Sequence, residues 1–237
     1  MKQLIFLTFL TLSCSVLFAQ SAKSLEKTRK ELAREIKRDA PKRARREAKV
    51  LMKQNYVVPA GAIPLDKQLE MAWEKQYEMD DRGFPRYIIG NATSIGTNYS
   101  AAKNQATNLA KVELAGLISS QIASLAENSV ANQDLSQQEA ASVVKTIEAS
   151  KNIIAQELGR VLNILEVYRT LENKNVEVQV RLAYSVDYAN EVVKKRLVQK
   201  LEDETKIAHD KLEKMMNLPG SQNYKKNSNS EDKDENR

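Results

Sequence analysis

Residues 176–186 read Val-Glu-Val-Gln-Val-Arg-Leu-Ala-Tyr-Ser-Val. Apolar side chains recur at every second position, and this period of two predicts a β-strand with one buried face and one solvent-exposed face. Residues 161–171 are rich in Val, Ile, Leu and Tyr, and they predict a second strand. The connection over residues 172–175 is polar and only four residues long. The two strands are therefore expected to form an antiparallel hairpin.

A third strand and a long helix are predicted ahead of this hairpin. Residues 86–96 are short, β-rich and bounded by glycine, which favours a strand. From about residue 100 to 128, apolar residues recur at spacings of three and four, as in a helix with one buried face. They are Ala102, Ala106, Leu109, Ala110, Leu114, Leu117, Ile118, Ile122 and Leu125. The alanines would let a sheet approach closely, and the larger residues are expected to fill the space where the sheet diverges.

Two further helices complete the predicted domain, which spans residues 86–216. The first covers about residues 134–158, where Ser136 and Glu139 have the spacing of a capping box. The second covers about residues 188–216. The predicted fold class is α+β: a small antiparallel sheet packed on a long helix, with the helices on one face and with helical N- and C-terminal extensions.

A basic helical arm is predicted over residues 20–55. Between residues 23 and 53, thirteen Lys and Arg stand against five Asp and Glu, a net charge of +8. Apolar residues at helical spacing favour a helix, which Pro41 is expected to interrupt. Because the apolar stripe is thin, the arm is expected to be solvated or to pair with a partner. Residues 56–85 are predicted to form a linker and a short helix, and the polar residues 217–237 a disordered tail.

The first nineteen residues predict a cleavable secretory signal peptide. A lysine is followed by apolar residues 4–16, and the small residue Ala19 ends the segment. This run is shorter than the roughly 20 residues that span a bilayer, and no later segment is expected to be apolar enough to span one. Cleavage after Ala19 is favoured. The alternative is acylation of Cys14, as in lipoproteins, for which Ser13 is suitable but Thr11 is not. Cleavage would leave the mature chain without cysteine and so without disulfides.

The strand and helix that precede the hairpin resemble a known family. Residues 87–94 read Tyr-Ile-Ile-Gly-Asn-Ala-Thr-Ser, and the alanine-stepped helix after them reaches Leu114-Ala-Gly-Leu-Ile118. With the Val-rich strand over 176–186, this order resembles the lipoprotein-twenty family of small bacterial envelope proteins over about residues 86–200. Related periplasmic domains occur in some flagellar-assembly proteins. The resemblance implies an α+β fold and a role in surface or periplasmic assemblies, with no catalytic residues to carry over. The chain departs from the family in lacking a convincing lipobox.

Residues suited to catalysis or metal binding are few. His209 is the only imidazole of the chain, and it is expected to be an exposed side chain of a charged helix. One His, with no cysteine after cleavage, does not supply the three or four ligands of a zinc site. Asp80 and Asp81 lack the spacing of a calcium loop and are expected to end a helix. The sequence therefore predicts no catalytic residue, no metal and no cofactor.

Two binding surfaces are predicted instead. The basic arm would suit an anionic membrane or cell-wall surface, and a plain solvated helix is the alternative. Its candidate residues are Lys42, Arg43, Arg45 and Arg46. Nucleic acid is not expected as a partner, because the chain is exported and the arm has no interleaved aromatic residues. Trp73 and Tyr77 would line an apolar groove if the protein binds clients or ligands.

These features together predict an exported, non-enzymatic envelope protein of a Gram-negative bacterium. It would be a structural or interaction component at the periplasmic side of a membrane or cell-wall assembly, associated with the outer membrane or free in the periplasm. Its partners would be other envelope proteins. The alternative function is that of a periplasmic chaperone or ligand-binding module.

Overall fold

The computed structural model describes residues 27–28, 31–32, 34–80, 85–159, 161–186 and 194–216. Its elements are an N-terminal helix over residues 34–53, α2 (Leu65–Tyr77), β1 (Tyr87–Gly96), α3 (Tyr99–Ala131), α4 (Gln137–Ala149), α5 (Lys151–Glu157), β2 (Leu162–Thr170), β3 (Val176–Ser185), α7 (Lys194–Thr205) and α8 (His209–Met216). The predicted signal peptide, Cys14 and the predicted tail lie outside the described residues.

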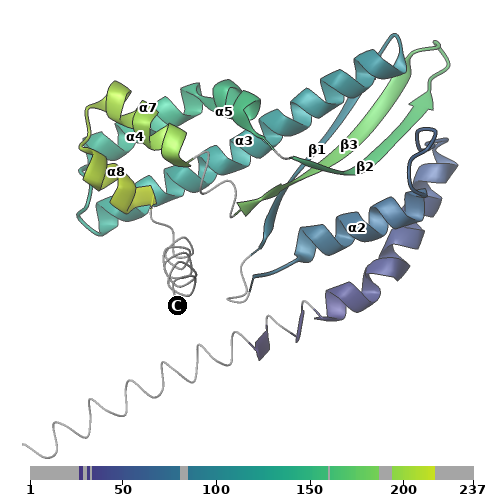
Figure 1. Cartoon of the computed structure of the whole chain (residues 1–237), viewed down its shortest axis with the longest axis horizontal. Helices are drawn as coiled ribbons and strands as arrows, with labels where there is room; N and C mark the ends of the chain where they lie inside the picture. The colour runs from purple at the N-terminus through teal and green to yellow at the C-terminus, as the bar shows by residue number, and fades with distance from the viewer. Residues whose placement is uncertain are drawn as a thin grey trace, which may run out of the picture.

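The three strands form one antiparallel sheet with β3 at its centre, in the order β1-β3-β2 (Figure 1). β1 pairs with β3 along its whole length, from Tyr87 opposite Ser185 to Gly96 opposite Val176. β2 pairs with β3 as the predicted hairpin, and Lys174 in its turn has a φ of 65°. The prediction of an α+β fold with an antiparallel sheet on a long helix is confirmed.

Helices cover both faces of this sheet, so the prediction of helices on one face was wrong. α3 packs on the face that carries Val178, Val180 and Leu182. The N-terminal helix and α2 cover the opposite face, which the sequence pattern had predicted to be exposed to solvent. Polar side chains of β3 also lie on that face. One of them is Arg181, which forms an ion pair with Glu47 of the N-terminal helix.

The predicted close approach of the sheet to the alanine-rich half of α3 is confirmed. Ala102, Ala106 and Ala110 are fully buried in the main core. A Cβ added to Gly90 of β1 would lie 2.5 Å from the carbonyl oxygen of Ala110, and one added to Gly96 would lie 2.6 Å from the amide nitrogen of Ala102. Small residues on both the strand and the helix are therefore needed for this contact.

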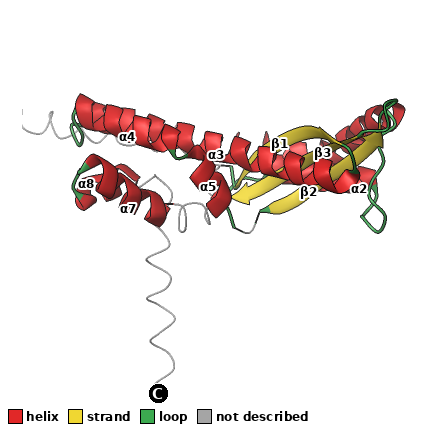
Figure 2. Cartoon of the chain, turned by 90° about the horizontal axis from the view of Figure 1, so that it is seen from above, coloured by secondary structure: helices red, strands yellow, loops and turns green. Residues whose placement is uncertain are grey.

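The second half of α3 packs against other helices and not against a diverging sheet. In Figure 2 the strands lie at one end of the molecule, α4, α7 and α8 lie at the other, and α3 runs through both. The predicted helix over 134–158 is divided at Ser150, whose hydroxyl donates to the carbonyl oxygen of Thr146 at 2.6 Å, a bond that bends helices. The predicted C-terminal helix is divided into α7 and α8 next to Lys206, whose φ is 59°.

α3 is also the one helix of the described residues that is long and apolar enough to cross a membrane by length and composition. The expectation that no segment after the signal peptide passes this test was therefore wrong. The core helix of a soluble protein can have the same length and composition. Here the apolar stripe of α3 packs on the sheet and on α4, α5 and α8.

The predicted capping box at the start of α4 is present and gives a testable pH dependence. Glu139 accepts from Lys211 of α8 at 2.8 Å and from the Ser136 amide at 2.7 Å, and these bonds lower the pKa of Glu139 from 4.5 to about 2. A lowered folded-state pKa adds stability above the unfolded pKa and loses it as the pH falls. We expect wild-type stability to fall between about pH 4.5 and pH 2 more steeply than that of Glu139→Gln. Urea denaturation across this range measures the difference, and parallel profiles would contradict it.

Candidate interaction surface

The N-terminal helix packs on the rest of the fold, whereas the sequence predicted an arm that is solvated or pairs with a partner. Its inner face carries Ala44, Ala48 and Leu51, which are buried in a second core cluster with residues of α2 and β2. The other members of this cluster are Tyr56, Leu65, Leu69, Leu165 and Val167. Alanine at successive turns lets the helix approach closely, so a stripe of small residues is enough to hold it.

Pro41 does not interrupt this helix, which is continuous over residues 34–53, and that prediction was wrong. A proline inside a helix removes one backbone hydrogen bond and costs about 3 kcal/mol. The buried residues Ala40 and Ala44 on either side of Pro41 show that packing of the helix continues through this position. The tertiary contacts of this helix thus outweigh the unfavourable effect of proline on helix formation.

A polar network fixes the middle of the helix to the sheet and to α2. The carboxylate of Glu47 accepts from the Arg181 guanidinium at 3.0 Å and from Nε1 of Trp73 at 2.8 Å. Nε of Arg181 also donates to the side-chain oxygen of Asn91 on β1, at 2.9 Å. Glu47 is the only acid between residues 40 and 65. Its charge is therefore neutralised inside the contact and is not available to the outer surface.

Trp73 and Tyr77, the predicted groove residues, are brought together by α2. Their rings stack with centroids 5.5 Å apart, and the guanidinium carbon of Arg43 lies 5.3 Å from the Trp73 ring. A hollow of about 430 Å³ beside them is lined by Tyr77 but not by Trp73. The other lining residues, mostly charged, are Arg34, Ile36, Lys37, Glu74, Lys75, Glu78 and Met79. A purely apolar groove is not what this lining provides.

The segment after the N-terminal helix is fixed by a second, half-buried ion pair. Arg169 of β2 bonds to Glu177 of β3 at 3.0 Å and lies over the ring of Tyr56, 4.8 Å from its centroid. The Tyr56 hydroxyl donates to Glu177. Burial, with this hydrogen bond to a carboxylate, raises the pKa of Tyr56 to about 12. The hydroxyl therefore keeps its proton and remains a donor throughout the physiological range.

A second buried carboxylate, Glu166, lies on the α3 side of the sheet. It accepts from the Tyr99 hydroxyl, from Lys103 at 2.9 Å and from Asn163 at 2.6 Å. Burial raises the pKa of Glu166, but these hydrogen bonds and the Lys103 charge outweigh burial, so the pKa lies below its usual value. An ionised carboxylate with all its partners inside the protein is suited to holding α3 on β2, not to proton transfer.

The outer face of the N-terminal helix is basic. At 3.6 residues per turn, four exposed bases lie within about 60° of one another around the helix and extend about 16 Å along it. We call this set the basic ridge; its members are Lys42, Arg46, Lys49 and Lys53. None of the four has an ion-pair partner within the part of the chain that the structure describes.

The structure separates the four bases selected from the sequence. Lys42 and Arg46 belong to the basic ridge, and Arg45 is exposed beside it. Arg43 instead lies on the Trp73 ring and helps to attach the helix. Sequence reasoning missed Lys49 and Lys53, because it selected bases by their density along the chain. Their spacing from Lys42, seven and eleven residues, would have placed them on the same helix face.

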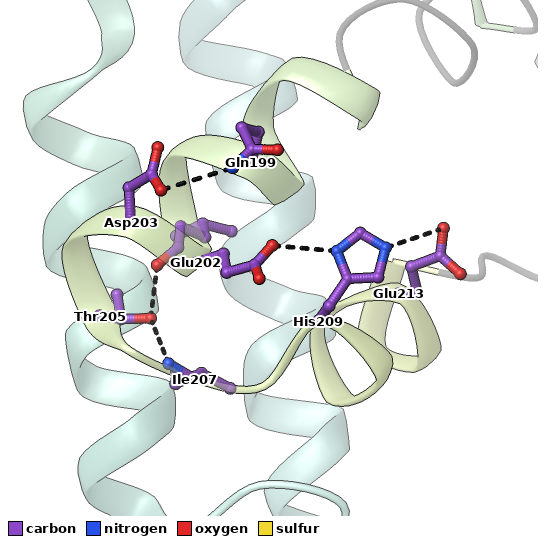
Figure 3. A network of polar contacts seen from close by, with 8 residues as sticks. Gln199, Glu202, Asp203, Thr205, Ile207, His209 and Glu213 are labelled. Atoms are coloured by element: carbon purple, nitrogen blue, oxygen red, sulfur yellow. Dashed lines mark hydrogen bonds and ion pairs between the residues drawn. The ribbon is translucent and has the colours of Figure 1, made fainter.

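His209 is exposed, as predicted, at the start of α8. Its ring nitrogens lie 3.1 Å from Glu202 of α7 and 3.7 Å from Glu213 of α8 (Figure 3). The hydroxyl of Thr205 donates to the carbonyl oxygen of Leu201, next to the break between these helices. Among the described residues, no group of three or more His, Cys, Asp or Glu is placed to hold a metal ion. The contacts of His209 thus connect α7 with α8.

Comparisons of the chain with protein-family models, with curated proteins and with solved structures found no match. The resemblance to the lipoprotein-twenty family therefore stays a prediction from the strand and helix motifs.

Proposed function

We propose that the protein is an exported, non-enzymatic component of a bacterial envelope, which binds an anionic surface through the basic ridge. The surface would be a membrane or cell-wall layer facing the periplasm, and other envelope proteins would be its partners. The observation that carries the proposal is a helix with two distinct faces. Its inner face is fixed to the sheet, and its outer face presents cations that no acid of the described chain neutralises.

A fixed helix makes a better binding surface than a mobile arm with the same charges. The helix is already ordered by Glu47, Trp73 and the buried alanines, so binding requires no further ordering of its backbone. Each Lys or Arg near an anionic surface contributes about 1 kcal/mol, which is roughly fivefold in affinity. Four aligned bases therefore contribute about 4 kcal/mol together, and this part of the attachment weakens as salt is added.

Neutralising the basic ridge is expected to weaken binding at least tenfold. The test variant is Lys42→Gln with Arg46→Gln and Lys49→Gln, which leaves Arg43 and the helix attachment intact. Binding of the exported protein to phosphatidylglycerol vesicles and to peptidoglycan sacculi would be measured by co-sedimentation at low salt, with phosphatidylcholine vesicles as the neutral reference.

The matched control removes the same charge at the helical end of the molecule. Lys145, Lys195 and Lys206 are exposed there, and their replacement by Gln lowers the net charge by the same three units. We expect this variant to bind within twofold of wild type. Equal losses in the two variants would show that only the total charge matters, and they would contradict a specific surface.

The export part of the proposal has its own test at the N-terminus. We expect the protein recovered after export to begin at Gln20 and to carry no fatty acid, because Ala19 ends the predicted signal peptide. Mass spectrometry of the intact exported chain measures this directly. A mature N-terminus at an acylated Cys14 would show a lipoprotein instead, and an unprocessed chain would contradict export by this signal.

A further inference from the structure

Exposed large apolar side chains are concentrated beside the basic ridge. Of the twelve such residues in the described part of the chain, four fall within the fourteen positions 50–63. Val50 is 52% exposed, Met52 55%, Val57 49% and Ile63 46%. Exposed apolar residues scattered singly are ordinary, but a concentration of them in one segment marks a contact surface.

These side chains are held outward by an ordered backbone. On the helix, Val50 and Met52 flank the ridge on either side, next to Lys49 and Lys53. Val57 exchanges two backbone hydrogen bonds with Tyr168 at the edge of β2, at 2.8 and 2.9 Å.

The loop that carries Val57 and Ile63 joins the helix to α2 at one end of the molecule (Figure 1). The carbonyl oxygen of Ile63 accepts from Gln68 of α2, at 2.9 Å. The loop is therefore attached at both of its ends, to β2 and to α2, while its apolar side chains stay exposed.

The charge of this segment is of one sign. Residues 48–65 contain Lys49 and Lys53 and no Asp or Glu. Lysines beside apolar side chains suit the interface of a bilayer, where the methylene stems and apolar groups enter the headgroup region and the ammonium groups stay at the phosphates. A soluble or wall-bound polyanion would contact the lysines but would give the apolar side chains nothing to enter.

We infer that the surface bound by this protein is an anionic lipid bilayer, into whose interface Val50, Met52, Val57 and Ile63 insert beside the basic ridge. The inference deepens the proposed function and rests on it, because the ridge supplies the charge attraction. The apolar side chains would then supply a part of the affinity for the bilayer that salt does not screen.

The experiment compares two probes, phosphatidylglycerol vesicles and sodium polyphosphate, at about 0.1 M and 0.5 M salt. The test variant replaces the four apolar residues by serine. The control replaces four other exposed apolar residues by serine, Met71, Leu109, Val112 and Ile153, which are 39–46% exposed. We expect the test variant to lose at least tenfold in vesicle binding, with polyphosphate binding within twofold of wild type. The control should match wild type on both probes.

A variant that is expected to strengthen vesicle binding provides a test that misfolding cannot imitate. Ile63→Trp is expected to bind vesicles several-fold more tightly than wild type, and Ile153→Trp is expected not to. Vesicle binding that survives in the serine variant and is unchanged in Ile63→Trp would overturn the lipid inference. The proposed function would then stand if the ridge variant still loses binding to both probes, and it would fall if wild type binds neither vesicles, sacculi nor polyphosphate.

Discussion

Gly90→Ala is expected to destabilise the protein by about 3 kcal/mol, at the upper end of the usual cost of overpacking. The new Cβ would lie 2.5 Å from the carbonyl oxygen of Ala110 and 2.7 Å from Cγ of Leu114. The first of these atoms belongs to the α3 backbone and cannot rotate away, so the strand and the helix must separate. Urea denaturation, with the midpoint and slope fitted together, measures the loss.

Gly116→Ala is the matched control, because it makes the same replacement of glycine by alanine within α3 itself. A Cβ at Gly116 meets nothing within 4 Å. Gly116→Ala is expected to stabilise the protein by up to about 1 kcal/mol, through the helix propensity of alanine. The two substitutions should therefore have opposite signs. A small effect at Gly90 would mean that the sheet does not approach α3 as closely as the structure shows.

The elements that were predictable from the sequence are those with a local signature. The alternation over residues 176–186 identified β3, and the spacing of Ser136 and Glu139 identified the start of α4. The alanine stripe of α3 even indicated the close approach to the sheet. For β3 and the start of α4, the structural cause lies within the strand or helical turn that carries the pattern.

The second helical layer was not predictable in this way, because its causes are distant in sequence. Arg181 looks like a solvent-facing residue of β3 until Glu47, 134 positions earlier, is placed on it. The inner face of the N-terminal helix is mostly alanine, and alanine gives a weaker sign of burial than large apolar residues do. Pro41 adds a local signal for a break that packing overrides. Local patterns cannot weigh such contacts.

The candidate site was half predictable for the same reason. The density of bases from Lys42 to Arg46 indicated the helix that carries the basic ridge, and the proposal uses the basic character of this helix. The division of these bases between an attached face and a free face depends on which side of the helix meets the sheet. Once that side is known, Arg43 is assigned to the attached face, on the Trp73 ring, and Lys53 to the basic ridge.

Leu69→Ala is expected to destabilise the protein by about 3 kcal/mol, because Leu69 is fully buried where α2, β2 and the N-terminal helix meet. Truncation leaves a cavity lined by parts of all three elements. If the N-terminal helix belongs to the same cooperative unit as the sheet, the loss appears in global unfolding. Amide hydrogen exchange should then show protection falling together in residues 44–53 and in α2.

Met71→Ala is the control on the same helix, since Met71 is 41% exposed and its truncation should change stability by less than about 0.5 kcal/mol. A helix that behaved as an independent arm would give a different result. Its amides, in residues 34–53, would exchange early in the wild type already. Leu69→Ala would then cause no further change in their exchange. That outcome would also remove the fixed inner face on which the proposed surface depends. The effect of Leu69→Ala therefore tests whether the helix that carries the basic ridge is fixed to the sheet or moves independently of it.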